Sequence, residues 1–268
     1  MGRIIFILLF SVSTLISSPV MNFVEEMISK DSFRKHRSLI KKIFQNESKF
    51  YNGNKLKIFE ILTKLKNNGI LKVFLNKPHS IQISFRGSGN PIFFMKLVSD
   101  SLQDLGYFKY RILEATRDKQ GFLWKIEFIS DYILDPTLLY SSLAKKNTKI
   151  IEIERKALFE WNFVIDTKNA RLNIPKLQKD KRTFFKTPVF DYWVDISNGS
   201  KLKFSSAGNK WHPYISFYNR NLTLIKVFQQ DEKTVNLNLD IPKNSKYIRI
   251  TDIYLLNNIK NGLRITLK

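Results

Sequence analysis

The chain of 268 residues contains no cysteine, and this absence excludes several classes of protein. Without thiols there is no disulfide framework, no thiolate metal site, no thiol nucleophile and no lipid-modified cysteine. The only histidines, His36, His79 and His212, lack the spacing of a metal-binding motif, so we expect no metal and no cofactor. Stability must then come from packing, which a hydrophobic content of 43% can support.

Acidic residues are scarce, 23 against 45 lysines and arginines, and the formal net charge is +22. Such a charge is typical of proteins that bind nucleic acid. Here, however, lysines outnumber arginines by 33 to 12, and the charges are spread along the chain instead of forming one tract. We therefore expect no nucleic-acid partner. Attraction to anionic lipid, acidic glycan or an acidic protein surface agrees better with this charge.

Motifs that carry catalytic chemistry are also missing. The Gly-Ser-Gly turn at 87–89 resembles the start of a dinucleotide-binding loop, but Ile92 stands where the third glycine belongs, and no Walker lysine follows. The serine of this turn is not part of a Gly-x-Ser-x-Gly elbow. Glu152 and Glu154 share one face of a predicted strand with Lys156, which is typical of a solvated charged row. We expect a non-enzymatic protein without catalytic residues.

Long hydrophobic runs are absent except at the N-terminus. Arg3 precedes a mainly apolar stretch over 4–16, and small residues follow up to Ser18, as in a secretory signal. The stretch is shorter than the roughly 20 residues that a membrane-spanning helix needs. We predict that residues 1–18 are a signal peptide and that the rest is periplasmic, without a transmembrane segment. An uncleaved N-terminal anchor is the alternative, because Pro19 would hinder cleavage after Ser18.

Apolar periodicity divides the following residues into helical and mixed parts. Residues 19–69 show apolar residues at three- and four-residue steps, which predicts a helical segment broken at 52–54. Residues 70–168 follow the order strand, helix, strand, strand, helix, strand, and a further strand at 161–165 extends the sheet. This order predicts a ferredoxin-like (βαββαβ) domain, whose sheet can leave one face open for docking.

The last part, residues 169–268, has no helical period and reads as short strands between polar turns. This pattern predicts an antiparallel β-sandwich of jelly-roll-like form. The basic stretch at 177–187 is interpreted as a linker or an exposed loop. The predicted fold class is therefore α+β, with N-terminal helices, a ferredoxin-like domain and a C-terminal sandwich.

One group of side chains in the predicted sandwich is typical of a binding site. Its members are Trp193, Trp211, His212, Tyr214 and Tyr218. Aromatic rings present an apolar face and a polar tip, so they can stack on sugar rings, and this predicts a glycan site. Strand alternation places Tyr214 and Tyr218 on one face, but it sends Trp193 and its neighbour Tyr192 to opposite faces. Packing in the core is therefore the other interpretation.

Three short motifs lie between Asn67 and Trp161: Asn-Asn-Gly-Ile-Leu-Lys at 67–72, Ser-Asp-Ser-Leu at 99–102 and Asp-Pro-Thr at 135–137. With a composition rich in Lys, Asn, Ile and Phe, this stretch resembles poorly characterised periplasmic proteins of epsilonproteobacteria (Campylobacter-type bacteria). The resemblance implies an accessory of flagellar motility or of the motor disks, and it supplies no catalytic residue. The C-terminal half resembles jelly-roll carbohydrate-binding modules only in general form.

These observations predict a non-enzymatic periplasmic protein of the cell envelope. We expect it to act as a scaffold or assembly factor in flagellar motility, with envelope proteins or a membrane-associated complex as partners. The alternative is a glycan- or peptidoglycan-binding protein that acts through the C-terminal sandwich.

Overall fold

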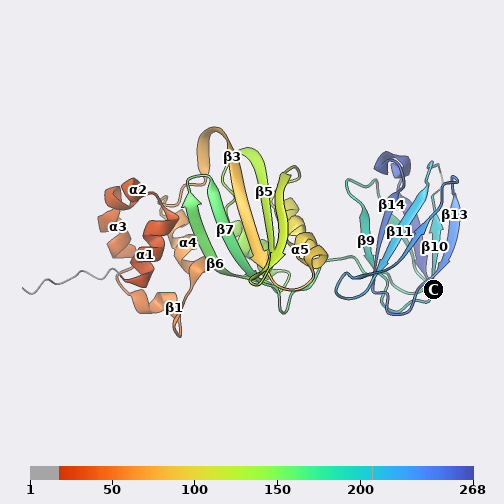
Figure 1. Ribbon diagram of the computed structural model, residues 1–268, viewed down its shortest axis with the longest axis horizontal. Helices are drawn as coiled ribbons and strands as arrows, with labels where there is room; N and C mark the ends of the chain where they lie inside the picture. Colours follow the sequence, from red (N-terminus) through yellow and green to blue (C-terminus); the bar gives the residue numbers. More distant parts are fainter. Residues whose placement is uncertain (1–17, 207) are drawn as a thin grey trace, which may run out of the picture.

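The computed structural model describes residues 18–206 and 208–268, which form a helical segment, a five-stranded sheet backed by helices, and a β-sandwich (Figure 1). The predicted α+β class is confirmed. The predicted signal peptide lies outside the described residues except for Ser18. Within those residues, no helix combines the length and the apolar character that crossing a membrane requires.

The N-terminal segment consists of short helices instead of the two longer ones expected. Serine hydroxyls explain one break, because Ser29 caps a new helix just after the first one ends. The predicted break at 52–54 is the turn of a small hairpin, where Gly53 has a φ of 57°. The elements are α1 (Pro19–Met27), α2 (Lys30–Lys35), α3 (Arg37–Ile43), η1 (Glu47–Phe50), β1 (Tyr51–Asn52), β2 (Lys55–Leu56) and α4 (Ile58–Asn67).

The central sheet has the strand order β4-β5-β3-β7-β6. Its strands are β3 (Phe74–Gly87), β4 (Arg111–Asp118), β5 (Gly121–Tyr132), β6 (Lys149–Ala157) and β7 (Glu160–Asp166). β7 pairs with β3 in parallel, and every other pair in the sheet is antiparallel. The additional strand therefore enters the interior of the sheet, between β3 and β6, and does not extend its edge.

Helices α5 (Pro91–Asp104) and α6 (Pro136–Ala144) cover one face of this sheet. Both begin as the sequence indicates, with Asn90 and Asp135 as N-caps and a proline in the first helical turn. Beneath them, Phe85 lies between Trp124 and Phe163 in one cross-strand row. The buried apolar residues of the N-terminal helices belong to the same core. The other face of the sheet is polar, with ion pairs such as Lys125–Glu160 at 3.1 Å.

The sandwich consists of two four-stranded sheets, β12-β11-β14-β9 and β13-β10-β15-β8. The interpretation of 177–187 as a linker or loop is wrong for its second half. Residues 182–185 form an edge strand, because Thr183 and Phe185 alternate inward and pair with β15. The strands are β8 (Arg182–Phe185), β9 (Tyr192–Asp195), β10 (Lys201–Ser205), β11 (Pro213–Tyr218), β12 (Leu224–Gln229), β13 (Asn236–Asp240), β14 (Tyr247–Asp252) and β15 (Leu263–Leu267), with η2 (Leu256–Ile259) before β15.

Candidate binding surfaces

Trp211, a member of the predicted glycan site, lies in the core of the sandwich. Its side chain is fully buried, and its ring centroid lies 5.6 Å from that of Phe204. The indole N–H donates a hydrogen bond of 2.9 Å to the carbonyl of Thr251. The residue therefore fills the space between the two sheets, where no sugar could reach it.

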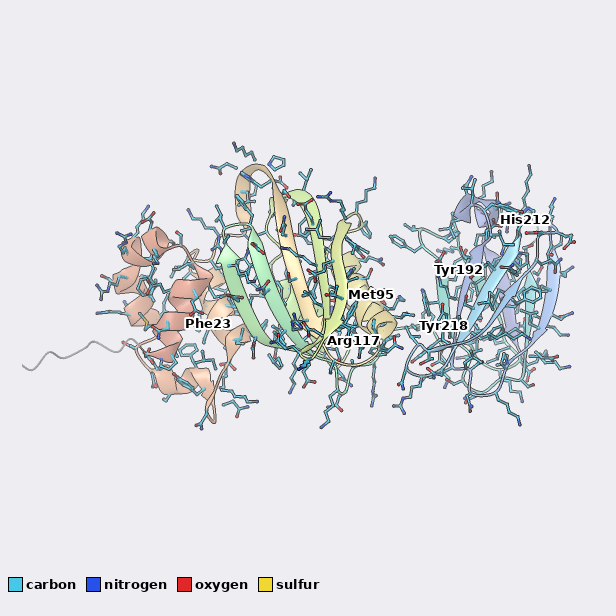
Figure 2. All side chains as sticks on the ribbon, viewed as in Figure 1. Phe23, Met95, Arg117, Tyr192, His212 and Tyr218 are labelled. Atoms are coloured by element: carbon cyan, nitrogen blue, oxygen red, sulfur yellow. The ribbon has the colours of Figure 1, made fainter. Side chains whose placement is uncertain are left out.

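His212 lies at one end of β11, away from Tyr218 at the other end (Figure 2). Its backbone N–H donates to the carboxylate of Asp252, and its ring meets that of Tyr254 edge to face at a centroid distance of 5.0 Å. Tyr254 is 60% exposed and donates a hydrogen bond of 3.3 Å to Asp231, whose negative charge raises the pKa of the phenol. No local pattern in the sequence marks Tyr254, because it follows a strand in a loop without alternation.

Trp193 and Tyr218 form the packing contact between the sandwich and helix α5, which we call the joint. Their ring centroids are 5.2 Å apart, and the Lys96 ammonium of α5 lies 5.4 Å from the Trp193 ring. Phe93 of α5 packs in the same group. Tyr218, Leu222 and Tyr247 form the buried part of this group, and Phe93, Leu172, Ile174 and Trp193 pack against them. These aromatic side chains therefore hold two parts of the chain together.

Tyr214 lies half-buried on the same face of β11 as Tyr218, as alternation predicted. The buried side chains of Ile215 and Phe217 occupy the opposite, core-facing side. The five residues of the predicted glycan site are thus divided among the core, the joint, the outer face of β11 and the end of the sandwich. They do not form one open aromatic surface.

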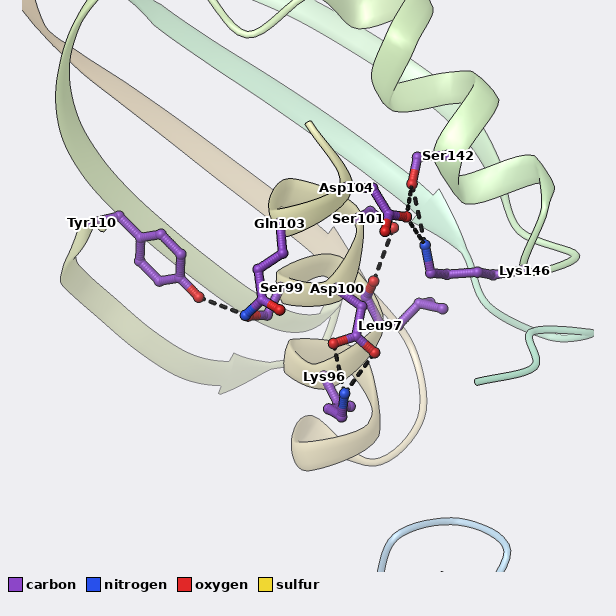
Figure 3. Close-up of polar contacts among 10 residues, drawn as sticks. All are labelled: Lys96, Leu97, Ser99, Asp100, Ser101, Gln103, Asp104, Tyr110, Ser142 and Lys146. Atoms are coloured by element: carbon purple, nitrogen blue, oxygen red, sulfur yellow. Dashed lines mark hydrogen bonds and ion pairs between the residues drawn. The ribbon is translucent and has the colours of Figure 1, made fainter. Parts of the chain in front are cut away.

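The outer side of α5 carries polar groups that are paired with one another (Figure 3). Lys96 forms an ion pair of 2.6 Å with Asp100, and Lys146, after α6, forms one of 2.6 Å with Asp104. The Lys146 side chain is only 4% exposed. Burial raises the pKa of Asp104, but hydrogen bonds from Lys146 and Ser142 outweigh this effect and lower it overall. These four side chains line a cavity of about 550 Å³ between α5 and the segment 185–193, and their charges cancel in pairs.

Next to this cavity lies an exposed apolar cluster, which we call the junction patch: Phe108, Val189 and Phe190. Their exposed fractions are 56%, 78% and 42%. The rings of Phe108 and Phe190 stack at a centroid distance of 6.2 Å, and Val189 and Phe190 line the cavity. Large apolar side chains gathered at a rim of polar residues are typical of protein–protein contact sites.

Strand β4, which begins three residues after Phe108, is one edge of the central sheet. Its residues are exposed except for the half-buried Glu114, and they include Ile112 at 53% and Leu113 at 37%. A register shift between Ile112 and Glu114 interrupts its pairing with β5. An uncovered edge presents free backbone donors and acceptors, to which a partner strand can bind.

A larger cavity, about 790 Å³, lies on the other side of the joint. Its walls include the cationic side chains of Lys168, Arg171, Arg220 and Lys246 and one acid, Asp195, which lies 3.9 Å from Lys246. The Gly-Ser-Gly turn borders it, but the backbone N–H groups that follow already bond to the Asn90 side chain. The turn therefore does not offer the free helix-start amides of a dinucleotide loop.

Among the residues that the structure describes, no group of three His, Asp or Glu side chains could hold a metal ion. No protein-family model matches the chain, and no curated protein matches it either.

Proposed function

We propose that the protein is a non-catalytic scaffold or assembly factor of the bacterial cell envelope, which docks a partner protein through the junction patch. The observation that carries this proposal is the exposure of Phe108, Val189 and Phe190 in one apolar cluster. Burying such side chains in an interface would remove a large apolar area from water, at about 25 cal/mol per Å².

The surroundings of the junction patch support a docking role. The ion pairs Lys96–Asp100 and Asp104–Lys146 lie along the adjoining cavity and supply a polar rim. The edge of β4, which follows Phe108, can add backbone hydrogen bonds to a partner strand. An apolar centre with aromatic side chains and a polar rim is the composition of interfaces in which a few residues supply most of the affinity.

A periplasmic location and a role in flagellar motility complete the proposal. Their support is the sequence alone: the apolar stretch after Arg3 and the resemblance over 67–161. Recovery of the untagged protein from the cytosol with Met1 still attached would contradict the location. A deletion strain with normal swimming and normal motor disks would contradict the role in motility.

We further propose that the central domain is a ferredoxin-like fold with one inserted strand, and that the sandwich is of jelly-roll-like form. The order β3-α5-β4-β5-α6-β6 supports the first assignment, since β7 is the only addition. The two four-stranded antiparallel sheets support the second. These assignments concern architecture and add no functional residue.

Substitution of Val189 by aspartate tests the docking site. Because a charge in the centre of an apolar interface is desolvated without a partner, we expect roughly 30-fold weaker capture of the partner. The measurement is crosslinking in intact cells followed by affinity purification and mass spectrometry, and then titration of the partner identified. Phe108→Asp should act in the same direction.

Ile129→Asp is the matched control, because Ile129 is also 78% exposed but lies on the polar face of the central sheet. Capture should be unchanged in this variant. If Ile129→Asp abolishes capture and Val189→Asp does not, the partner binds the open sheet face and the junction patch is not the docking site.

The alternative function, glycan binding, needs a sandwich surface other than the predicted aromatic group. Trp211 is in the core, and Trp193 and Tyr218 are occupied in the joint with α5.

A further inference from the structure

The outer face of the sheet β13-β10-β15-β8 carries a regular array of exposed side chains. The strand register places eight of its side chains in two neighbouring cross-strand rows: Arg182, Thr266, Lys203 and Asn238 in one, and Phe184, Arg264, Ser205 and Asn236 in the other. We call these residues the basic face. It points away from helix α5, since the other sheet of the sandwich supplies the residues of the joint (Figure 1).

The polar side chains of the basic face have no partners within the described chain. Arg182, Lys203, Asn236 and Asn238 are exposed and make no side-chain hydrogen bond or ion pair there. Arg264 is likewise without an ion pair and lies over the Phe184 ring at 5.2 Å. The register also places Asp240 outward, one row beyond Lys203 and Asn238, where it lies 3.6 Å from Lys201. The two rows of the basic face therefore have free cations and free amides and contain no acid of their own.

This arrangement is unfavourable for the folded protein by itself. From the spacing of strands and of residues along them, the cations of Arg182, Lys203 and Arg264 project within roughly 7–10 Å of one another, so they repel. Asparagine is depleted in strands, yet Asn236 and Asn238 both project outward from β13. Except for Arg264, which contacts the Phe184 ring, these residues oppose local stability without a compensating internal contact, and this points to a function outside the chain.

We propose that the basic face binds an acidic polysaccharide, a glycan chain that carries carboxylate groups. The three cations match carboxylates repeated along such a chain, and the amides and hydroxyls of Asn236, Asn238, Ser205 and Thr266 match sugar hydroxyls. Phe184, 51% exposed, offers an apolar contact for one sugar ring beside Arg264. A lipid surface would instead favour several apolar side chains able to insert, and these rows contain one.

This site is independent of the proposed docking function, because it uses none of the residues of the junction patch. The two functions can therefore fail separately. A variant of the basic face should still capture the protein partner, and Val189→Asp should still bind polysaccharide.

The test is binding of the purified protein to polygalacturonate, measured by affinity electrophoresis and by titration. The triple variant Arg182→Ala, Lys203→Ala, Arg264→Ala should bind roughly 30-fold more weakly, since each lost charge-assisted hydrogen bond weakens binding several-fold. Asn238→Ala and Phe184→Ala should each weaken binding less. All these side chains project from the surface, so circular dichroism and the melting temperature should show an intact fold.

The matched control is the triple variant Lys233→Ala, Lys243→Ala, Lys260→Ala, which removes the same charge from exposed positions outside the face. It should bind almost as well as the unchanged protein, and dextran should not bind. Equal losses in both triple variants would show non-specific attraction by net charge and would overturn the proposal. Binding to phosphatidylglycerol vesicles but not to polygalacturonate, unaffected by Phe184→Ala, would overturn it in favour of a membrane surface.

Discussion

Replacement of Trp211 by alanine is expected to lower the free energy of unfolding by about 3–5 kcal/mol, the range for removing a large aromatic side chain from a packed core. The indole is fully buried beside Phe204, and it satisfies the carbonyl of Thr251. The substitution would leave a cavity and a partly buried carbonyl without its donor. Chemical denaturation followed by tryptophan fluorescence and circular dichroism gives the measurement.

Trp193→Ala is the comparison for this prediction. Trp193 is half-buried and packs between Tyr218 and Lys96. Its loss should weaken the contact between the sandwich and α5, and it should lower the free energy of unfolding of the sandwich much less than Trp211→Ala does. An equal decrease in the free energy of unfolding for the two substitutions would contradict the placement of Trp211 in the core. If Trp211→Ala weakens any glycan binding, it should do so only in proportion to unfolding, because the ring cannot touch a ligand.

Replacement of Asp135 by alanine is expected to lower the free energy of unfolding by about 2–3 kcal/mol. Its buried carboxylate caps α6 by accepting from the backbone N–H groups of Thr137 and Leu138, and it lies 2.6 Å from the Lys66 ammonium of α4. Loss of the cap contributes about 1 kcal/mol, and loss of a partly buried ion pair contributes about 1–2 kcal/mol. Asp135→Asn separates the two effects, because asparagine still caps a helix but carries no charge.

The same residue predicts a pH dependence. Burial raises the pKa of Asp135, but the hydrogen bonds from Lys66 and Thr137 outweigh it and hold the pKa below its usual value of 3.8. A carboxyl with a lowered pKa stabilises the fold above its unfolded value and loses this contribution as the pH falls through its folded value. The difference in free energy of unfolding between the unchanged protein and Asp135→Asn should therefore have its full value above about pH 5 and decrease below pH 3.8. A difference constant down to pH 2 would contradict the ion pair.

Local signals in the sequence predicted the elements of the middle part well. Asn90-Pro91 and Asp135-Pro136 start α5 and α6 because a capping side chain and a fixed proline φ act within one turn of helix. The strand β8 was missed, because its alternation covers only four residues and lies in a lysine-rich stretch. The position of β7 was also beyond local reasoning, since strand order depends on which segments pair across the whole domain.

For the candidate sites, too, local sequence patterns predicted some features, and long-range packing decided the others. Alternation predicted that Tyr214 and Tyr218 share a face, but not that Tyr218 would be covered by α5 and the segment around Leu172. The junction patch unites Phe108 with Val189 and Phe190, residues far apart in the chain, and no local pattern marks them. The basic face depends on the register of four strands, in which residues from 182 to 266 become neighbours.

By itself, the sequence determined the α+β class, the caps and turns, the lack of thiol chemistry and the large positive charge, because each of these is a property of composition or of a few consecutive residues. Only the tertiary structure decided which aromatic side chains are buried, which strand edge stays uncovered and where unpaired cations gather. Those outcomes depend on packing and on strand register between distant segments, and contacts of that kind leave no trace in the local order of residues.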